Sequence, residues 1–309
     1  MDYMKRAFLL TAFLAGNSLI ANPSVDARRG FVVSADSFLQ TRTQGEGYRV
    51  VSIGHSCVIS ALGPFSKVAR ASGYEGHLSF MQFFGGPGGA PEAQWKRTGE
   101  QQQAKKALGP GRVDVMTFGH FVGPNGETTG CKFEDYQRWM DLALEHNPDI
   151  RFYIQDLWPW LPTEGRILKL GDFKLGEYEG KMADALLGLR ELIVKLDKKY
   201  PGRVQGIPVG LAMVELVRQL EDRKLPGVDS IVVTPKEAKA IGRVGLYRDM
   251  IHPTDLVAKL QGYIYLATIY GKNPLDLKEG MYPDPELDKM IRGLAWEITV
   301  NNPYRLKKR

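Results

Sequence analysis

Residues 51–60 read VSIGHSCVIS, and they contain the end of one predicted element and the start of the next. The first half is rich in β-branched residues, as a buried strand is, and it stops at Gly54. The residues after Ser56 place apolar side chains at intervals of three and four, the spacing of an amphipathic helix. Ser56 therefore lies on a turn from strand to helix, where a serine can be a nucleophile or can cap the helix.

The same alternation of extended and helical patterns continues along the chain. Extended patterns occupy 48–54, 77–84, 113–119, 151–157 and 204–210. Helical spacing occupies 56–71, 91–108, 133–146, 181–199, 211–223 and 253–270. Strands that alternate with helices predict a single-domain α/β/α sandwich with a mostly five-stranded parallel sheet. Segments 159–180 and 272–309 are predicted to be irregular excursions, and the first could form a small lid.

The amino-terminal residues have the layout of a secretory signal peptide. A basic pair, Lys5–Arg6, precedes a short apolar run, and small residues follow that run. A buried helix is the alternative interpretation. Cleavage after Ala21 or after Ala27 predicts an exported protein, periplasmic or extracellular, with no membrane span. The predicted division is a signal peptide at 1–27 and a mature domain at 28–309.

Composition limits the classes of partner. The formal net charge is +6, with 43% hydrophobic and 25% charged residues, which are ordinary globular values. The basic residues form no stripe with interleaved aromatic residues, so no nucleic-acid partner is indicated; mild attraction to acidic polymers is the alternative. The oligomeric state cannot be predicted. Cys57 and Cys131 could form one disulfide in an oxidising compartment, but we favour a buried free thiol at Cys57.

A nucleophilic serine needs a base, and His252 is the best placed of the five histidines. Asp249 lies three residues before it, and a predicted helix begins directly after it. In one compact turn, Asp249 can accept a hydrogen bond from one imidazole nitrogen, which leaves the other free to take the proton of Ser56. A surface ion pair would have the same sequence pattern.

An ester hydrolase also needs donors for an oxyanion. GGPGG at 85–89 follows the second predicted strand, where glycines let the backbone approach a substrate closely. A flexible surface loop is the alternative. His120 ends the third predicted strand and could donate to the same oxygen, or could be a structural histidine.

Together these segments resemble the SGNH, or GDSL-like, hydrolase superfamily. The similar segments are SIGHS at 52–56, FFGGPGG at 83–89, RDMIHP at 248–253 and, as in a secreted branch of the superfamily, GIPVGLAMVEL at 206–216. The resemblance implies a flavodoxin-like three-layer fold in which Ser56 is the nucleophile and Asp249 and His252 complete a triad. It places the N–H groups of Ser56 and Gly86 at the oxyanion, with His120 in support. No cofactor is implied, and no residues with metal-ligand spacing occur.

Two positions depart from the superfamily pattern. The first block normally carries Asp-Ser, where this chain has His55-Ser56. The third block normally presents Gly-x-Asn-Asp, where this chain has Gly119-His120. The family's asparagine donates to the oxyanion, so His120, or less favourably Asn125, is the substitute donor. Loss of one such donor costs about 2 to 4 kcal/mol of transition-state stabilisation.

The segment QDLWPW at 155–160 follows the fourth predicted strand, so it belongs to the same rim of the sheet. Gln155 could bond a hydroxyl group, while Trp158 and Trp160 could stack on sugar rings or fill the core, and we expect one of each. The sequence therefore predicts a secreted serine esterase that removes acyl groups, for instance acetyl, from carbohydrate or from a small ester. The alternative is a carbohydrate-binding protein on the same fold that has lost catalysis.

Overall fold

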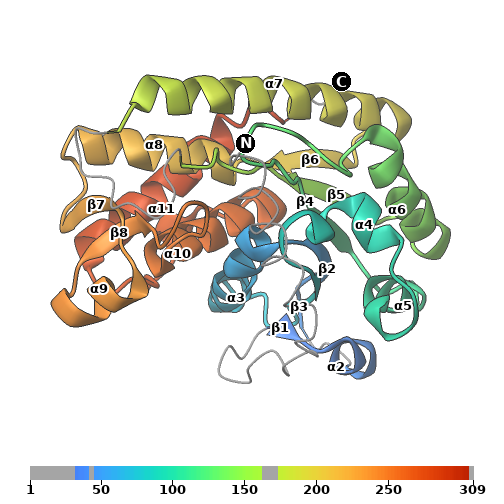
Figure 1. Cartoon of the computed structure of the whole chain (residues 1–309). Helices are drawn as coiled ribbons and strands as arrows, with labels where there is room; N and C mark the ends of the chain where they lie inside the picture. The colour runs from blue at the N-terminus through green and yellow to red at the C-terminus, as the bar shows by residue number, and fades with distance from the viewer. Residues whose placement is uncertain (1–31, 42–44, 162–172, 306–309) are drawn as a thin grey trace, which may run out of the picture. The chain divides into compact units, whose positions relative to one another are not determined.

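The computed structural model describes residues 32–41, 45–161 and 173–305 (Figure 1). The chain divides into two compact units, 1–30 and 31–309, and all described residues belong to the second. The predicted signal peptide, with its two cleavage sites, lies outside the described residues, as do residues 162–172 of the predicted lid. Within the described ranges, no helix is long and apolar enough to cross a membrane.

A parallel six-stranded sheet forms the centre of the fold, with the strand order β1-β3-β2-β4-β5-β6. The strands are β1 (Val32–Val33), β2 (Arg49–Gly54), β3 (Leu78–Phe83), β4 (Val115–Gly119), β5 (Arg151–Gln155) and β6 (Val204–Ile207). The five predicted strands are confirmed, and β1 adds an edge strand that the sequence did not indicate. Because β3 and β4 lie on opposite sides of β2, the strand order reverses at β2, which is where such sheets bind ligands.

Helices cover both faces of this sheet, which explains why β2 and β4 are buried throughout. The helices that correspond to predicted ones are α3 (Ser56–Ala71), α6 (Phe133–His146), α7 (Leu175–Lys199), α8 (Val209–Glu221) and α10 (Asp255–Tyr265), which continues into the π-helical η4 (Leu266–Tyr270). On one face, α5 (Gln103–Leu108), α6 and α7 share an apolar core with alternate strand residues such as Ile53 and Phe118. On the other face α3 packs against α10 (Figure 1).

Several predicted boundaries were wrong. The single helix predicted for 91–108 is divided into α4 (Pro91–Trp95), the 3-10 turn η3 (Gly99–Gln101) and α5. The break falls where Gly99 adopts a positive φ of 54°, which glycine alone adopts easily. The predicted irregular segment 272–309 contains η5 (Pro274–Asp276) and the long helix α11 (Pro285–Val300), which Asp284 caps. The other predicted excursion, 159–180, includes the start of α7.

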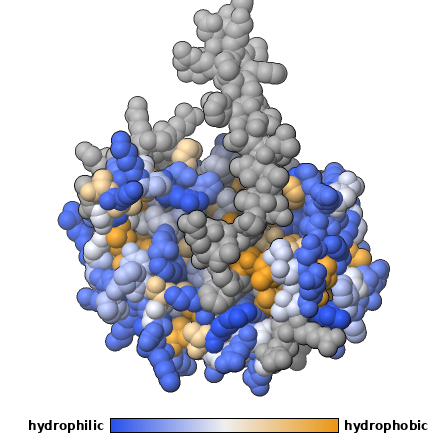
Figure 2. Space-filling view, turned by 90° about the horizontal axis from the view of Figure 1, so that it is seen from below, coloured by the Kyte–Doolittle hydropathy of each residue, from blue (hydrophilic) through white to orange (hydrophobic). Residues whose placement is uncertain are grey.

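One further unit lies between α8 and α10, where the sequence indicated no element. It consists of β7 (Val228–Val232), α9 (Pro235–Ile241) and β8 (Val244–Tyr247), and the two strands pair as a separate parallel sheet. The described chain also includes a short helix, α2 (Ala35–Gln40). On the face drawn in Figure 2, hydrophobic residues lie in small groups between hydrophilic ones.

Candidate active site

Ser56 is the first residue of α3, two residues beyond the end of the central strand β2. The residue that caps this helix is His55, whose Nδ1 accepts a long hydrogen bond of 3.4 Å from the N–H of Cys57. An imidazole thus performs the capping that an aspartate or serine side chain usually performs. The hydroxyl group of Ser56 is not used for capping and is left for other partners.

Ser56, His252 and Asp249 form one hydrogen-bonded chain. His252 Nε2 lies 2.7 Å from Ser56 Oγ, and His252 Nδ1 lies 2.7 Å from Asp249 Oδ2. Because an ionised carboxylate can only accept, Nδ1 carries the proton and Nε2 can accept the proton of the serine. The arrangement can therefore deprotonate Ser56 when it attacks an electrophile.

The local turn keeps Asp249 ionised. Its Oδ1 accepts hydrogen bonds from the N–H groups of Ile251 and His252, at 3.0 and 2.8 Å. Partial burial alone would raise the pKa of Asp249, but the bonds from His252 and from these N–H groups outweigh it and lower the pKa to about 2. Asp249 is consequently a permanent acceptor for the imidazole at neutral pH.

Two residues distant in the sequence hold the turn that contains His252. Trp158 Nε1 donates to the carbonyl oxygen of Ile251 at 2.8 Å, and the thiol of Cys57 lies 3.7 Å from the same oxygen. Cys57 adjoins Ser56, so this contact ties the turn directly to the start of α3. Cys57 and Cys131 are both buried free thiols, as we favoured for Cys57.

The glycine loop 85–89 packs against the end of β2. Phe84 N donates to the carbonyl oxygen of Gly54 at 3.2 Å. A Cβ atom on Gly89 would lie 2.6 Å from the carbonyl carbon of Gly54 and 2.7 Å from His55 Cβ, a space that only glycine can fill. This close approach places the 3-10 turn η2 (Gly86–Gly89) beside the residues that precede Ser56.

Two buried glutamines behind this loop are structural residues that sequence reasoning missed. Gln94 Nε2 donates to the carbonyl oxygens of Gly54 and Gln82, at 3.3 and 3.2 Å, and Gln82 Nε2 donates to Gln94 Oε1 at 2.6 Å. These bonds tie the loop's two flanking elements to the strand end before Ser56. Glutamine is common on surfaces, so no sequence signal marks this pair.

His120 is buried at the end of β4, with Nδ1 2.8 Å from the hydroxyl group of Tyr136. Burial lowers the pKa of His120 to about 4, so the ring is neutral. It can donate through Nε2 only if the Tyr136 hydroxyl donates to Nδ1. The alternative donor, Asn125, is exposed, and its backbone N–H binds Glu127 at 3.0 Å.

His55 is also buried and neutral. Burial lowers its pKa to about 4, partly offset by a contact with the backbone of His120. Its Nε2 has no hydrogen-bond partner among the described residues.

Gln155 and Trp158, which we predicted at the substrate-binding rim, are buried and bond to other parts of the protein. Gln155 is 1% exposed, and its side chain donates to the carbonyl oxygen of Cys57 at 3.2 Å and accepts from Tyr265 at 2.6 Å. Trp158 is fully buried. Trp160 is partly exposed and donates to Val122 O at 2.8 Å, so one tryptophan is core and one reaches the surface, as expected.

Asp156, which had no predicted partner, caps the start of α8 although it lies far from that helix in the sequence. Its carboxyl group accepts from the N–H groups of Gly210 and Leu211, at 2.6 and 3.4 Å, and from the hydroxyl group of Tyr304 at 3.0 Å. Complete burial raises the pKa of Asp156 to about 7, and these donors only partly oppose it. Its place at the sheet's rim is therefore explained by helix capping.

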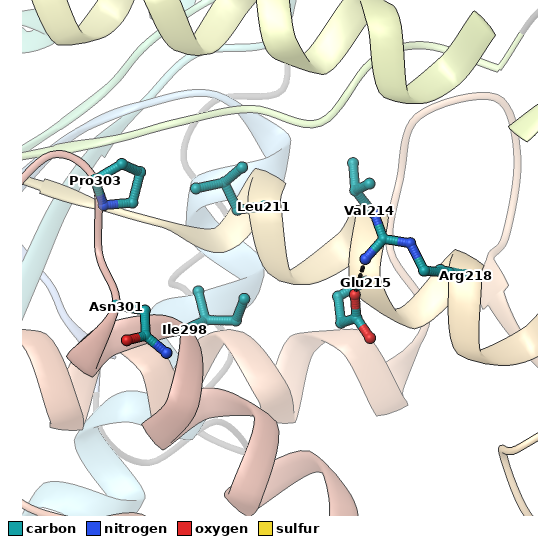
Figure 3. Close-up of a pocket in the computed structure, with 7 residues that line it drawn as sticks. All are labelled: Leu211, Val214, Glu215, Arg218, Ile298, Asn301 and Pro303. Atoms are coloured by element: carbon teal, nitrogen blue, oxygen red, sulfur yellow. Dashed lines mark hydrogen bonds and ion pairs between the residues drawn. The ribbon is translucent and has the colours of Figure 1, made fainter. Parts of the chain in front are cut away.

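A cavity of about 180 Å³ lies elsewhere, between α8 and α11 (Figure 3). Leu211, Val214 and Ile298 are among its lining residues, and Arg218 pairs with Glu215 at one end. Neither Ser56 nor its hydrogen-bonded partners line it. Among the described residues, no three His, Cys, Asp or Glu side chains are grouped so that they could hold a metal ion.

No protein-family model matches the sequence, and no curated protein matches it. Solved structures do match. A DUF4886 family protein from Bacteroides uniformis superimposes with a TM-score of 0.51 at 12% identity, over 85% of this chain and 98% of that one. At this identity, the likeness shows the α/β fold alone.

Two other solved structures are similar at lower scores. A protein from Parabacteroides merdae described as a GDSL-like lipase has a TM-score of 0.42 at 9% identity, over 73% of this chain and 97% of that one. The periplasmic domain of a lipopolysaccharide acetyltransferase from Salmonella ser. Paratyphi A has a TM-score of 0.45 at 10% identity, over 88% and 98%. The chemistry of this chain must accordingly be argued from its own residues.

Proposed function

We propose that this protein is an exported serine esterase that hydrolyses acyl esters, acetyl esters among them, on carbohydrate. One observation carries the proposal: Ser56 Oγ, His252 and Asp249 are joined by hydrogen bonds of 2.7 Å at the carboxyl end of the central strand. A protein that only binds carbohydrate has no need of a serine, an imidazole and an ionised carboxylate in this order.

The reaction proceeds through an acyl-enzyme. Ser56 Oγ attacks the ester carbonyl carbon while His252 Nε2 takes its proton, and Asp249 stabilises the resulting imidazolium. The tetrahedral intermediate collapses when the alkoxide leaves with the proton from His252. A water molecule then attacks the acyl-enzyme while His252 takes a proton from it. The bond between the acyl group and Ser56 breaks, the proton passes from His252 to Ser56 Oγ, and the carboxylic acid is released.

Backbone donors stabilise the oxyanion in this proposal. The first N–H groups of a helix have no intrahelical partner, so the N–H of Ser56 can point at the developing charge, where the dipole of α3 also favours it. The N–H of Gly86 is the second donor, because η2 packs beside the end of β2. His120 is the third donor in the tautomer whose Nε2 carries the proton.

Carbohydrate is the proposed alcohol part of the ester. Trp160 supports it, since this partly exposed ring is fixed by its bond to Val122 and can stack on a sugar. The predicted signal peptide supports export.

Covalent labelling of the serine tests the proposal. We expect a fluorophosphonate probe to attach once per chain, on the peptide that contains Ser56, and to stop hydrolysis of 4-nitrophenyl acetate. The same probe should label His252→Ala far more slowly, because that variant lacks the base. Binding of acetylated xylan with neither labelling nor turnover would instead establish the carbohydrate-binding alternative.

Replacement of Gly89 by alanine is expected to lower kcat/KM for 4-nitrophenyl acetate by about tenfold or more. The added methyl group would overlap backbone atoms of Gly54, so the loop must move away from Ser56, at a cost of about 1 to 3 kcal/mol in stability. Gly85→Ala is the matched control, because its φ is −71° and a Cβ there has no neighbour within 4 Å. Equal rates for both variants would show that the loop position does not matter.

A further inference from the structure

Two arginines lie on the segments that surround Ser56, and neither pairs with a carboxylate among the described residues. Arg97 follows the glycine loop and α4, and its Nη2 lies 3.2 Å from the position that a Cβ on Gly88 would take. Arg248 begins the turn that contains His252 and donates its N–H to the carbonyl oxygen of that residue at 3.0 Å. By contrast, other basic side chains of the described chain pair with a carboxylate at the surface, as Lys96 does with Glu92.

The guanidinium of Arg97 is held in place by neutral groups. Its carbon lies 3.9 Å from the ring centroid of Phe84, and Nη1 donates to Gln101 Oε1 at 3.3 Å. Its Nε is buried without a hydrogen-bond partner. Stacking on Phe84 fixes the plane of the group and leaves its positive charge unneutralised, and a planar guanidinium of this kind is suited to bind a carboxylate through two parallel bonds.

Arg248 adds a second positive charge near the nucleophile. Its side chain is exposed, and its backbone belongs to the turn that holds His252 against Ser56. The carboxylate closest in sequence, Asp249, is committed to His252 and to two N–H groups of the turn. The segments around Ser56 thus carry two arginines with no carboxylate partner among the described residues, and one carboxylate that is already bound.

We propose that the substrate is an acyl ester of an acidic carbohydrate, whose carboxylate binds Arg97 while Arg248 attracts the same charge. This inference rests on the proposed esterase activity and narrows its substrate to sugars that carry a carboxylate, such as uronates. The net charge of +6 favours the approach of a polyanion to the protein as a whole. Arg97 acts on specificity, whereas the acyl transfer itself is left to Ser56 and His252.

Acetylated polygalacturonate tests this, because methyl esterification removes its carboxylate charge and leaves its acetyl groups. We expect the wild-type protein to release acetate from the free acid with a kcat/KM about tenfold or more above that for the methylated form. Arg97→Gln should raise KM for the free acid about tenfold and bring the ratio close to one, and Arg97→Lys should give an intermediate ratio. Arg248→Gln should lower the ratio about threefold, and 0.5 M NaCl should lower it in the wild type.

Arg190→Gln is the matched control, because Arg190 is an exposed arginine of α7 outside the site, and it should keep the wild-type ratio. Equal rates of the wild type on both polymers would overturn the proposal, as would an Arg97→Gln variant that loses activity equally on both, which a merely structural arginine would produce. Failure of this inference alone leaves hydrolysis of 4-nitrophenyl acetate intact. Absence of turnover on every ester would overturn the esterase activity and this inference together.

Discussion

Replacement of Ser56 by alanine is expected to lower kcat for 4-nitrophenyl acetate by about ten-thousandfold or more, because no other group can form the acyl-enzyme. The fold should be retained. Ser56 stands at the first position of α3, while the cap is provided by His55, so the variant loses no capping bond. Far-UV circular dichroism and the urea midpoint should therefore match those of the wild type while the rate collapses.

The matched control is Ser60→Ala, one turn further along α3. Its hydroxyl group donates to Gln261 Oε1 at 2.8 Å and to the carbonyl oxygen of Cys57 at 3.1 Å, so it takes part in packing and has no assigned role in catalysis. We expect this variant to keep most of the wild-type rate. If Ser56→Ala turned over as fast as Ser60→Ala, Ser56 would not be the nucleophile.

Combination with the base variant sharpens the test. His252→Ala alone should lose nearly as much as Ser56→Ala, and the double variant should lose little more, because the two side chains act as one unit in a single step. Losses that multiplied would indicate two independent roles. Such a result would favour a site in which His252 acts on another group.

The elements of the central fold could be predicted because their signals are local. β2 and β4 consist mainly of apolar residues and are buried throughout. α3 and α6 have apolar residues at helical spacing, and both predicted helix ranges agree with the structure. The β7–α9–β8 unit was missed because its strands are short and β7 exposes Asp229. Charged residues at an exposed position weaken an extended pattern.

The candidate site divides in the same way. The order of Ser56, Asp249 and His252 can be read from short segments, and the structure brings all three together. Their supports could not be found in this way, since the bond from Trp158 to Ile251 joins residues 93 positions apart. A polar side chain that will be buried looks the same in sequence as one that will be solvated, so the structural use of Gln155 could not be foreseen.

A fall in pH from 6.5 to 4.5 is expected to destabilise the protein strongly, because three histidines are buried in neutral form. Burial lowers the pKa of His55 and His120 to about 4 and that of His77 to about 3. In the unfolded chain each takes up a proton near pH 6.5. The full stability is therefore present above pH 6.5 and is lost as the pH falls toward 4, where the folded state begins to accept the protons.

The size of the effect follows from the linkage between proton uptake and folding. Each histidine removes up to about 1.4 kcal/mol per pH unit, so three remove about 4 kcal/mol per unit. Asp156 opposes them, because burial raises its pKa to about 7. Its folded form gains a proton as the pH falls through 7, which offsets roughly one histidine. The free energy of unfolding therefore falls by about 3 kcal/mol per pH unit. A fall of two pH units removes much of the roughly 5 to 15 kcal/mol by which a typical domain is stable.

Urea unfolding at pH 7.0, 6.0, 5.0 and 4.5 measures this slope. His77→Gln should reduce the slope by about 1.4 kcal/mol per pH unit, whatever the cost of losing the ring's bonds to Tyr270 and Ser79. His146→Gln, at the exposed end of α6, is the matched control variant. A stability that did not change between pH 6.5 and 4.5 would contradict this prediction. It would mean that the buried histidine rings take up protons in the folded state as readily as in the unfolded chain.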